Sequence, residues 1–147
     1  MRKNNITFIF NKDLFIEEFD FTVFRKNVSK IINIILKKES YQLDKLNFNF
    51  CDDKEIISYN KKYLKHNYET DILTFKYEDG ILIESDIIIS VETILRNSKR
   101  YKTGFTNELY RVIIHGILHI CNYDDNSNDD KKLMKSKENF YLNILKI

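Results

Sequence analysis

The spacing of hydrophobic positions divides the first part of the chain into strands and helices. Residues 6–10 and 45–50 alternate apolar and polar side chains, which is the period of a strand with one buried face. Residues 21–38 place apolar side chains three and four positions apart, which predicts an amphipathic helix. The aspartates at 52–53 can cap a further helix, which runs to about residue 64.

A strand pair follows in the second part of the chain. Residues 71–77 and 81–89 have the composition of strands, and Glu78-Asp79-Gly80 between them is typical of a turn. Ser90 begins a helix that runs to about Lys102.

Two more helices complete the predicted order. The helix over about 106–120 is apolar on every side at 112–114 and 117–118, so we expect it in the middle of the domain. Ser127 and Asp130 resemble a capping box at the start of a last helix, which ends near residue 145. The order β-α-β-α-β-β-α-α-α predicts one α+β domain over residues 1–147, with a small, mostly four-stranded mixed sheet covered by helices and a central apolar helix that binds a metal.

Composition narrows the class of protein without naming a function. Hydrophobic residues make up 43% of the 147 residues and charged residues 31%, an ordinary globular balance, and a net charge of +2 does not by itself indicate nucleic acid. No apolar run approaches the ~20 residues that span a bilayer, and the first residues lack the apolar stretch of a signal peptide. Two cysteines are too few for a disulfide scaffold. We therefore expect a cytoplasmic protein with no membrane partner.

The segment from His115 to Asp125 carries the candidate chemistry. His115 and His119 are one helical turn apart on one face, and Asp125 follows His115 by ten residues, the spacing of the third ligand in HExxHxxGxxH sites. This pattern predicts one divalent metal, with a fourth position open for water. The alternative is a pair of core histidines satisfied by hydrogen bonds. Asp124 and Cys121 are the rival ligands, although Cys121 points away from the histidine face and suits a buried apolar position.

Two neighbouring residues sharpen this interpretation. Gly116 occupies the position of the general base in HExxH metalloproteases and has no side chain, which argues against proteolysis. Gly116 either allows another segment to pass close to the helix or reflects simple helix packing. Asn122 tolerates left-handed backbone geometry and can therefore end the helix.

Three blocks of the chain resemble the YbeY family of bacterial metal-dependent endoribonucleases. HGILHICNYDD at 115–125 is similar to the family signature HGxLHLxGYDH, NKKYL at 60–64 with TDILTF at 70–75 is similar to its NRxYR and T(N/D)VLSF segments, and SDIIIS at 85–90 is similar to GDIxIS. The resemblance covers roughly residues 50–138. It implies an α+β fold, one zinc ion, single-stranded RNA as substrate, and a cytoplasmic role in rRNA maturation and ribosome quality control beside the ribosome or its small-subunit components, with no small-molecule cofactor.

The departures from the family pattern define the expected site. Asp125 stands where the family has a third histidine, and Lys61 stands where it has a functionally important arginine. A lysine neutralises phosphate as a point charge but makes no bidentate fork. We expect His115, His119 and Lys61 to be catalytic, and the metal to be held by the two histidines and Asp125.

Further basic residues are candidates for RNA binding. The expected substrate-binding set is Lys61, Lys62, Arg96 and Arg100, the last two from a basic stretch next to Tyr101. A solvated helix face explains that stretch equally well. The proton acceptor stays open between Asp124, bulk water and the substrate. The alternative to a nuclease is a non-catalytic RNA-binding ribosome-assembly factor with a structural metal.

Overall fold

The computed structural model describes residues 5–15, 18–65 and 70–146, which form one α+β domain. The strands are β1 (Ile6–Phe10), β2 (Gln42–Cys51), β3 (Ile72–Lys76) and β4 (Leu82–Ser90). The helices are α1 (Phe21–Lys38), α2 (Asp53–Leu64), α3 (Val91–Tyr101), α4 (Phe105–Ile120) and α5 (Asn128–Leu145). The α+β fold class and the predicted order of elements are confirmed; a short 3₁₀ turn, η1 (Lys12–Leu14), was not predicted.

The four strands form a mixed sheet in the order β1-β2-β4-β3. β1, β2 and β4 are parallel, and β3 pairs with β4 in the antiparallel direction. β2 begins three residues earlier than its hydrophobic alternation predicts, because its polar start pairs with the start of β4 across a register shift between Leu43 and Lys45. β4 lies inside the sheet and is buried on both faces along its second half.

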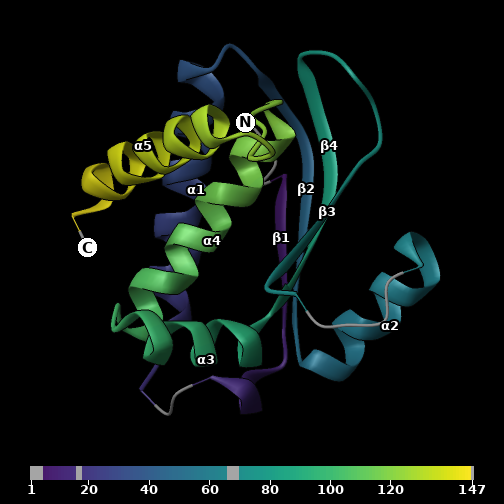
Figure 1. The fold of residues 1–147 in the computed structure, drawn as a ribbon, viewed down its shortest axis with the longest axis vertical. Helices are drawn as coiled ribbons and strands as arrows, with labels where there is room; N and C mark the ends of the chain where they lie inside the picture. Colours follow the sequence, from purple (N-terminus) through teal and green to yellow (C-terminus); the bar gives the residue numbers. More distant parts are fainter. Residues whose placement is uncertain (1–4, 16–17, 66–69, 147) are drawn as a thin grey trace.

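Helices cover the two faces of the sheet unequally (Figure 1). α1, α4 and α5 lie on one face, and α2 lies on the other. Ile87 and Ile89 of β4 belong to the main core beneath α1 and α4, whereas Ile88 faces the other way and packs with Ile56 of α2. Within the described residues, no helix has both the length and the apolarity that crossing a membrane requires.

α4 runs through the middle of the helical layer and contacts α1, α3, α5 and β3. The apolar positions 112–114 and 117–118 are buried as expected, and one face of the helix carries a polar stripe. The stripe runs along one face at helical spacing and consists of Glu108, Arg111, His115 and His119.

Gly116 marks the place where β3 crosses close to α4. A Cβ atom built on Gly116 would lie 2.5 Å from Cδ1 of Ile72, well inside van der Waals contact. Of the two interpretations of this glycine, the structure supports the close approach of another segment. The approach brings the start of β3 and the preceding Asp71 beside the histidine face of α4.

Candidate metal centre

The end of α4 is built so that the chain turns back beside its own histidines. Asn122 has φ of 71°, the left-handed geometry expected from the sequence. The N–H of Asn122 donates to the carbonyl of His119, and the N–H of Tyr123 donates to the carbonyl of Leu118, at 2.9 and 3.0 Å. This pair of hydrogen bonds is a Schellman motif, and it carries the chain directly to Asp125.

The three expected ligands converge. The Nε2 atoms of His115 and His119 lie 2.9 Å apart, and Oδ2 of Asp125 lies 3.5 Å from each of them. A tetrahedral zinc site with bonds of about 2.05 Å has ligand atoms roughly 3.3 Å apart, so this spacing suits one small cation. The three side chains are 26%, 30% and 41% exposed, so a substrate can reach them.

Hydrogen bonds on the far sides of the two rings determine which nitrogens face the centre. Nδ1 of His115 is 2.6 Å from Oε2 of Glu138, and Nδ1 of His119 is 2.9 Å from the backbone carbonyl of Tyr123. Both partners are acceptors, so each Nδ1 carries the proton and donates it. Neutral rings then present two Nε2 lone pairs to each other and to a carboxylate. A cation at their centre turns that repulsion into coordination, so the residues present fit a divalent metal.

The surroundings of His115 are negatively charged. Burial lowers the pKa of His115, but the hydrogen bond and charge of Glu138, with the charges of Asp71 and Asp125, outweigh it and raise the pKa above its usual value. Burial also raises the pKa of Asp71, against the attraction of His115. An environment that favours a protonated imidazole favours a bound cation for the same electrostatic reason.

α5 supplies the support for His115. Glu138 lies on the buried side of α5, and its other oxygen accepts a hydrogen bond from Nη1 of Arg111 at 3.1 Å. Arg111 also donates from Nη2 to Oδ1 of Asn139 at 2.9 Å. The chain Arg111–Glu138–His115 therefore links α4 to α5 and holds the ring of His115 in place.

Side chains from the end of α1 and from β3 form hydrogen bonds with the turn that carries Tyr123. Glu39, just after α1, accepts hydrogen bonds from the hydroxyls of Tyr123 and Tyr141, both at 2.6 Å. Nζ of Lys76 donates to the carbonyl of Ile120 at 2.9 Å. These contacts fix the carbonyl that orients His119.

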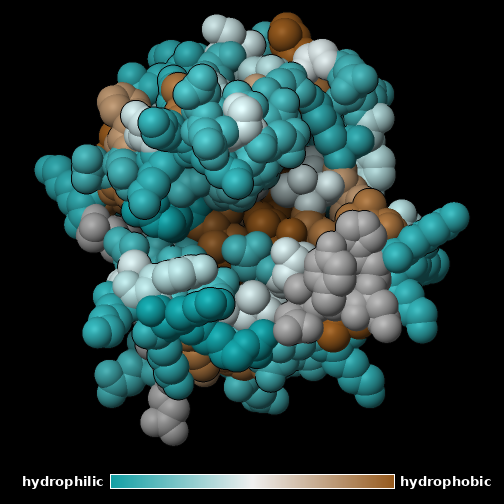
Figure 2. Space-filling view, viewed as in Figure 1, coloured by the Kyte–Doolittle hydropathy of each residue, from teal (hydrophilic) through white to brown (hydrophobic). Residues whose placement is uncertain are grey.

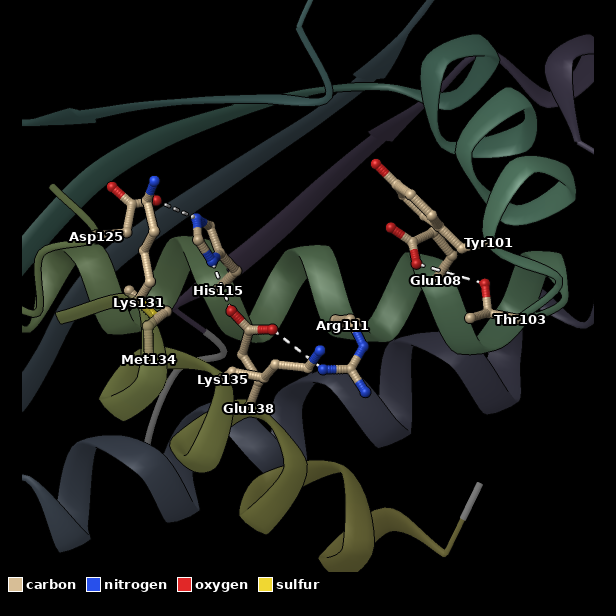
Figure 3. Close-up of a pocket in the computed structure, with 10 residues that line it drawn as sticks. All are labelled: Tyr101, Thr103, Glu108, Arg111, His115, Asp125, Lys131, Met134, Lys135 and Glu138. Atoms are coloured by element: carbon tan, nitrogen blue, oxygen red, sulfur yellow. Dashed lines mark hydrogen bonds and ion pairs between the residues drawn. The ribbon is translucent and has the colours of Figure 1, made fainter. Parts of the chain in front are cut away.

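The centre opens into a pocket of about 600 Å³ between the end of α3, the polar stripe of α4 and the first turns of α5. Figure 2 shows that this face of the molecule is hollowed. We call the cavity between α3, α4 and α5 the α3–α5 pocket. Its lining consists of Tyr101, Thr103, Glu108, Arg111, His115, Asp125, Lys131, Met134, Lys135 and Glu138 (Figure 3).

The basic residues expected to bind RNA lie outside this pocket. Lys61 and Lys62 are exposed on α2, against the opposite face of the sheet from α4. Arg96 forms an ion pair with Asp53, with Nη1 and Oδ2 2.7 Å apart, so it joins α3 to α2. Arg100 is exposed near the end of α3. Their roles toward a substrate stay predictions.

The two rival ligands, Cys121 and Asp124, lie apart from the three candidate ligands. Cys121 is buried, and burial raises the pKa of its thiol to about 12, as suits a small apolar position. Asp124 is exposed and lies outside the α3–α5 pocket. Among the described residues, His115, His119 and Asp125 form the one group of three that could hold a metal.

The sequence analysis missed the residues that support the ligands. Glu138 could have been noticed as an acidic residue on the apolar stripe of α5, between Met134 and Tyr141. Arg111 is one turn before His115 on the same face of α4, which was a weaker signal. Nothing local in the sequence connects Glu39 to Tyr123.

Comparisons with known proteins concern the chain as a whole. A family model described as Endoribonuclease YbeY matches residues 9–146. The chain is 43% identical over 118 residues to the Endoribonuclease YbeY of Karelsulcia muelleri, which covers 80% of this chain and 84% of that protein. It is 38% identical over 132 residues to the Endoribonuclease YbeY of Flavobacterium psychrophilum, covering 88% and 94%. A solution structure from Thermotoga maritima shares the fold, with a TM-score of 0.64 at 24% identity and coverage of 95% and 88%.

Proposed function

Because the chain belongs to the Endoribonuclease YbeY family, we propose that it is a metal-dependent, single-strand-specific endoribonuclease that acts in rRNA maturation and ribosome quality control. In this proposal the substrate is a single-stranded rRNA precursor. The protein acts in the cytoplasm, and its partners are the ribosome or components of the small subunit. The observation that supports the chemistry is the convergence of two Nε2 atoms and one carboxylate oxygen, 2.9 to 3.5 Å apart, at the wall of an open pocket.

His115, His119 and Asp125 hold the metal in this proposal, and Zn²⁺ suits two imidazoles with one carboxylate. A bound metal of this kind lowers the pKa of water and polarises a phosphoryl oxygen. Glu138 and the carbonyl of Tyr123 accept hydrogen bonds from the two Nδ1 atoms and so aim both Nε2 atoms at the centre. With three protein ligands, a tetrahedral metal would keep one position for water or substrate.

The chain's own cations provide the remaining roles. The basic residues expected from the sequence lie outside the pocket, so in this proposal Lys61, Lys62, Arg96 and Arg100 contact the RNA backbone where the strand leaves the metal centre. Gly116 has no side chain to accept a proton, so the acceptor is Asp124, bulk water or the substrate.

The test joins metal content to RNA cleavage. The purified protein should contain about one metal per chain by elemental analysis and should cut single-stranded RNA in preference to duplex RNA. A chelator should abolish cutting. His119→Ala should lose both metal and cleavage, because it removes one of three ligands. Cys121→Ala is the matched control on the same segment and should keep its metal.

Two outcomes would contradict the proposal. Full metal occupancy in His119→Ala would mean that the metal lies elsewhere. RNA binding by a metal-loaded protein without any cleavage would favour the alternative of a non-catalytic assembly factor.

A further inference from the structure

Two lysines of α5 line the α3–α5 pocket without an acidic partner. Figure 3 shows Lys131 extending toward Asp125 and Lys135 extending toward Arg111. Both lysines are exposed, and within the described part of the chain neither forms an ion pair with an aspartate or glutamate. They are four residues apart, so they lie on one face of α5 and are separated by about 6 Å along its axis.

The acidic groups of the pocket are already engaged. Glu138 is bound by Arg111 on one oxygen and by His115 on the other. Asp125 faces the two imidazoles. Glu108 is buried, and its Oε1 accepts a hydrogen bond from Oγ1 of Thr103 at 3.4 Å. The two lysines are therefore the charges that the pocket leaves available to an anion.

An aromatic ring stands at the other end of the pocket. Tyr101 ends α3, is 58% exposed and lines the same cavity as His115. Nucleic-acid bases stack on exposed aromatic rings only when they are unpaired, as in a single strand. Cations along one wall and a ring at the far end together match the two chemical parts of a single-stranded nucleic acid.

We propose that the α3–α5 pocket is the binding path of the RNA strand at the site of cleavage, an inference that rests on the proposed function. Lys131 and Lys135 bind phosphates beside the one that reaches the His115–His119–Asp125 centre, and Tyr101 stacks on a base farther along the strand. This path differs from the one expected from the sequence, since Lys61 and Lys62 lie on α2 and Arg96 is tied to Asp53.

The lysines are tested by binding as a function of salt. The metal-loaded protein is titrated with a fluorescent, 2′-O-methylated single-stranded RNA, which resists cleavage, at several salt concentrations. Lys131→Ala combined with Lys135→Ala should weaken binding about tenfold and reduce the slope of log affinity against log salt by about 1.4, or ~0.7 for each lost phosphate contact. The control combines Lys132→Ala with Lys30→Ala, two exposed lysines outside the pocket with the same change in charge.

Tyr101 is tested in the same assay. Tyr101→Ala should lose about tenfold in affinity for the single strand with little change in salt slope, because stacking involves no counterion. Tyr101→Phe keeps the ring and should recover most of that loss. Metal content, measured for every variant, should equal that of the wild type, since none of these residues is a ligand.

The outcomes separate this inference from the proposed function. A larger affinity loss and a smaller salt slope in the pocket pair than in the control pair support it. If the pocket pair and the control pair lose the same affinity for RNA, and the wild-type protein still cuts RNA, the binding path is overturned. The proposed function is then unaffected. A wild-type protein that neither binds nor cuts single-stranded RNA overturns both.

Discussion

Each histidine of this centre is oriented by a hydrogen bond from Nδ1, on the side of the ring that faces away from the other ligands. His115 would coordinate a metal through Nε2, but the direction of that nitrogen depends on the hydrogen bond from Nδ1 to Glu138. Glu138 depends in turn on Arg111, which balances its charge in a buried position. A ligand that looks local in the sequence is therefore supported by a helix that begins more than ten residues later.

Glu138→Gln tests this dependence. The amide keeps the size of the side chain but loses the charge that favours a cation next to His115, so we expect metal affinity to fall 10- to 100-fold. Competition with a chromophoric chelator measures the affinity, and circular dichroism checks that the variant is folded. Glu78→Gln, an exposed acid in the β3–β4 connection, makes the same change away from the site. An unchanged affinity in Glu138→Gln would mean that His115 needs no carboxylate to bind the metal.

At the scale of elements, two contacts bring the segments of the site together. β3 passes α4 at Gly116, and α2 is tied to α3 by Asp53. The carboxylate of Asp53 accepts hydrogen bonds from the hydroxyls of Ser90 and Thr93, both at 2.6 Å, besides its ion pair with Arg96. Asp52, not Asp53, is the N-cap of α2, so Asp53 is free to bridge the helices.

The β3–α4 contact predicts a double-mutant coupling. Gly116→Ala should gain up to about 1 kcal/mol from helix propensity, but its new Cβ meets Cδ1 of Ile72. Ile72→Val removes that methyl group. We therefore expect Gly116→Ala to be more favourable in the Ile72→Val background than alone, with a coupling of about 0.5–2 kcal/mol in urea unfolding. Additive effects would show that β3 moves away from α4 at little cost.

The α2–α3 contact predicts a pH-dependent stability. Burial raises the pKa of Asp53, but its hydrogen bonds with Arg96, Ser90 and Thr93 and the charge of Arg96 outweigh it, so the pKa falls below the usual 3.8. A lowered carboxylate pKa adds stability that is present above 3.8 and disappears as the pH falls through the folded-state value.

Asp53→Asn should therefore cost about 1 kcal/mol in the free energy of unfolding at neutral pH, because Arg96 is half exposed and its ion pair is partly screened. The difference from the wild type should shrink as the pH falls through the lowered pKa. Urea unfolding across this range measures both. Asp44→Asn, an exposed aspartate of β2, is the control for loss of one charge. A difference that stays constant with pH would assign the effect to something other than the ionised carboxylate.

At the scale of the whole molecule, the sequence predicted those features that are contained within a short segment of the chain. Alternation and helical spacing predicted the order of elements, and the metal group was found because His115, His119 and Asp125 lie within one short segment. The sheet order β1-β2-β4-β3 depends on pairings between distant strands, which no window of residues contains. For the same reason Glu138 and Glu39 were missed, since each reaches the site from another helix.

This assembly predicts that metal binding stabilises the entire domain. The ligands lie on α4 and the turn after it, Glu138 brings in α5, and Glu39 brings in the end of α1, so an unfolded chain would present no such site. A metal at 100 times its dissociation constant should then add about 2.7 kcal/mol to the free energy of unfolding. Thermal unfolding of the chelator-treated protein, with and without added Zn²⁺, measures the gain.

His119→Ala should unfold at the same temperature in both conditions. A wild-type protein that gains no stability from Zn²⁺, or a His119→Ala variant that gains as much, would show that the three side chains do not form a metal site.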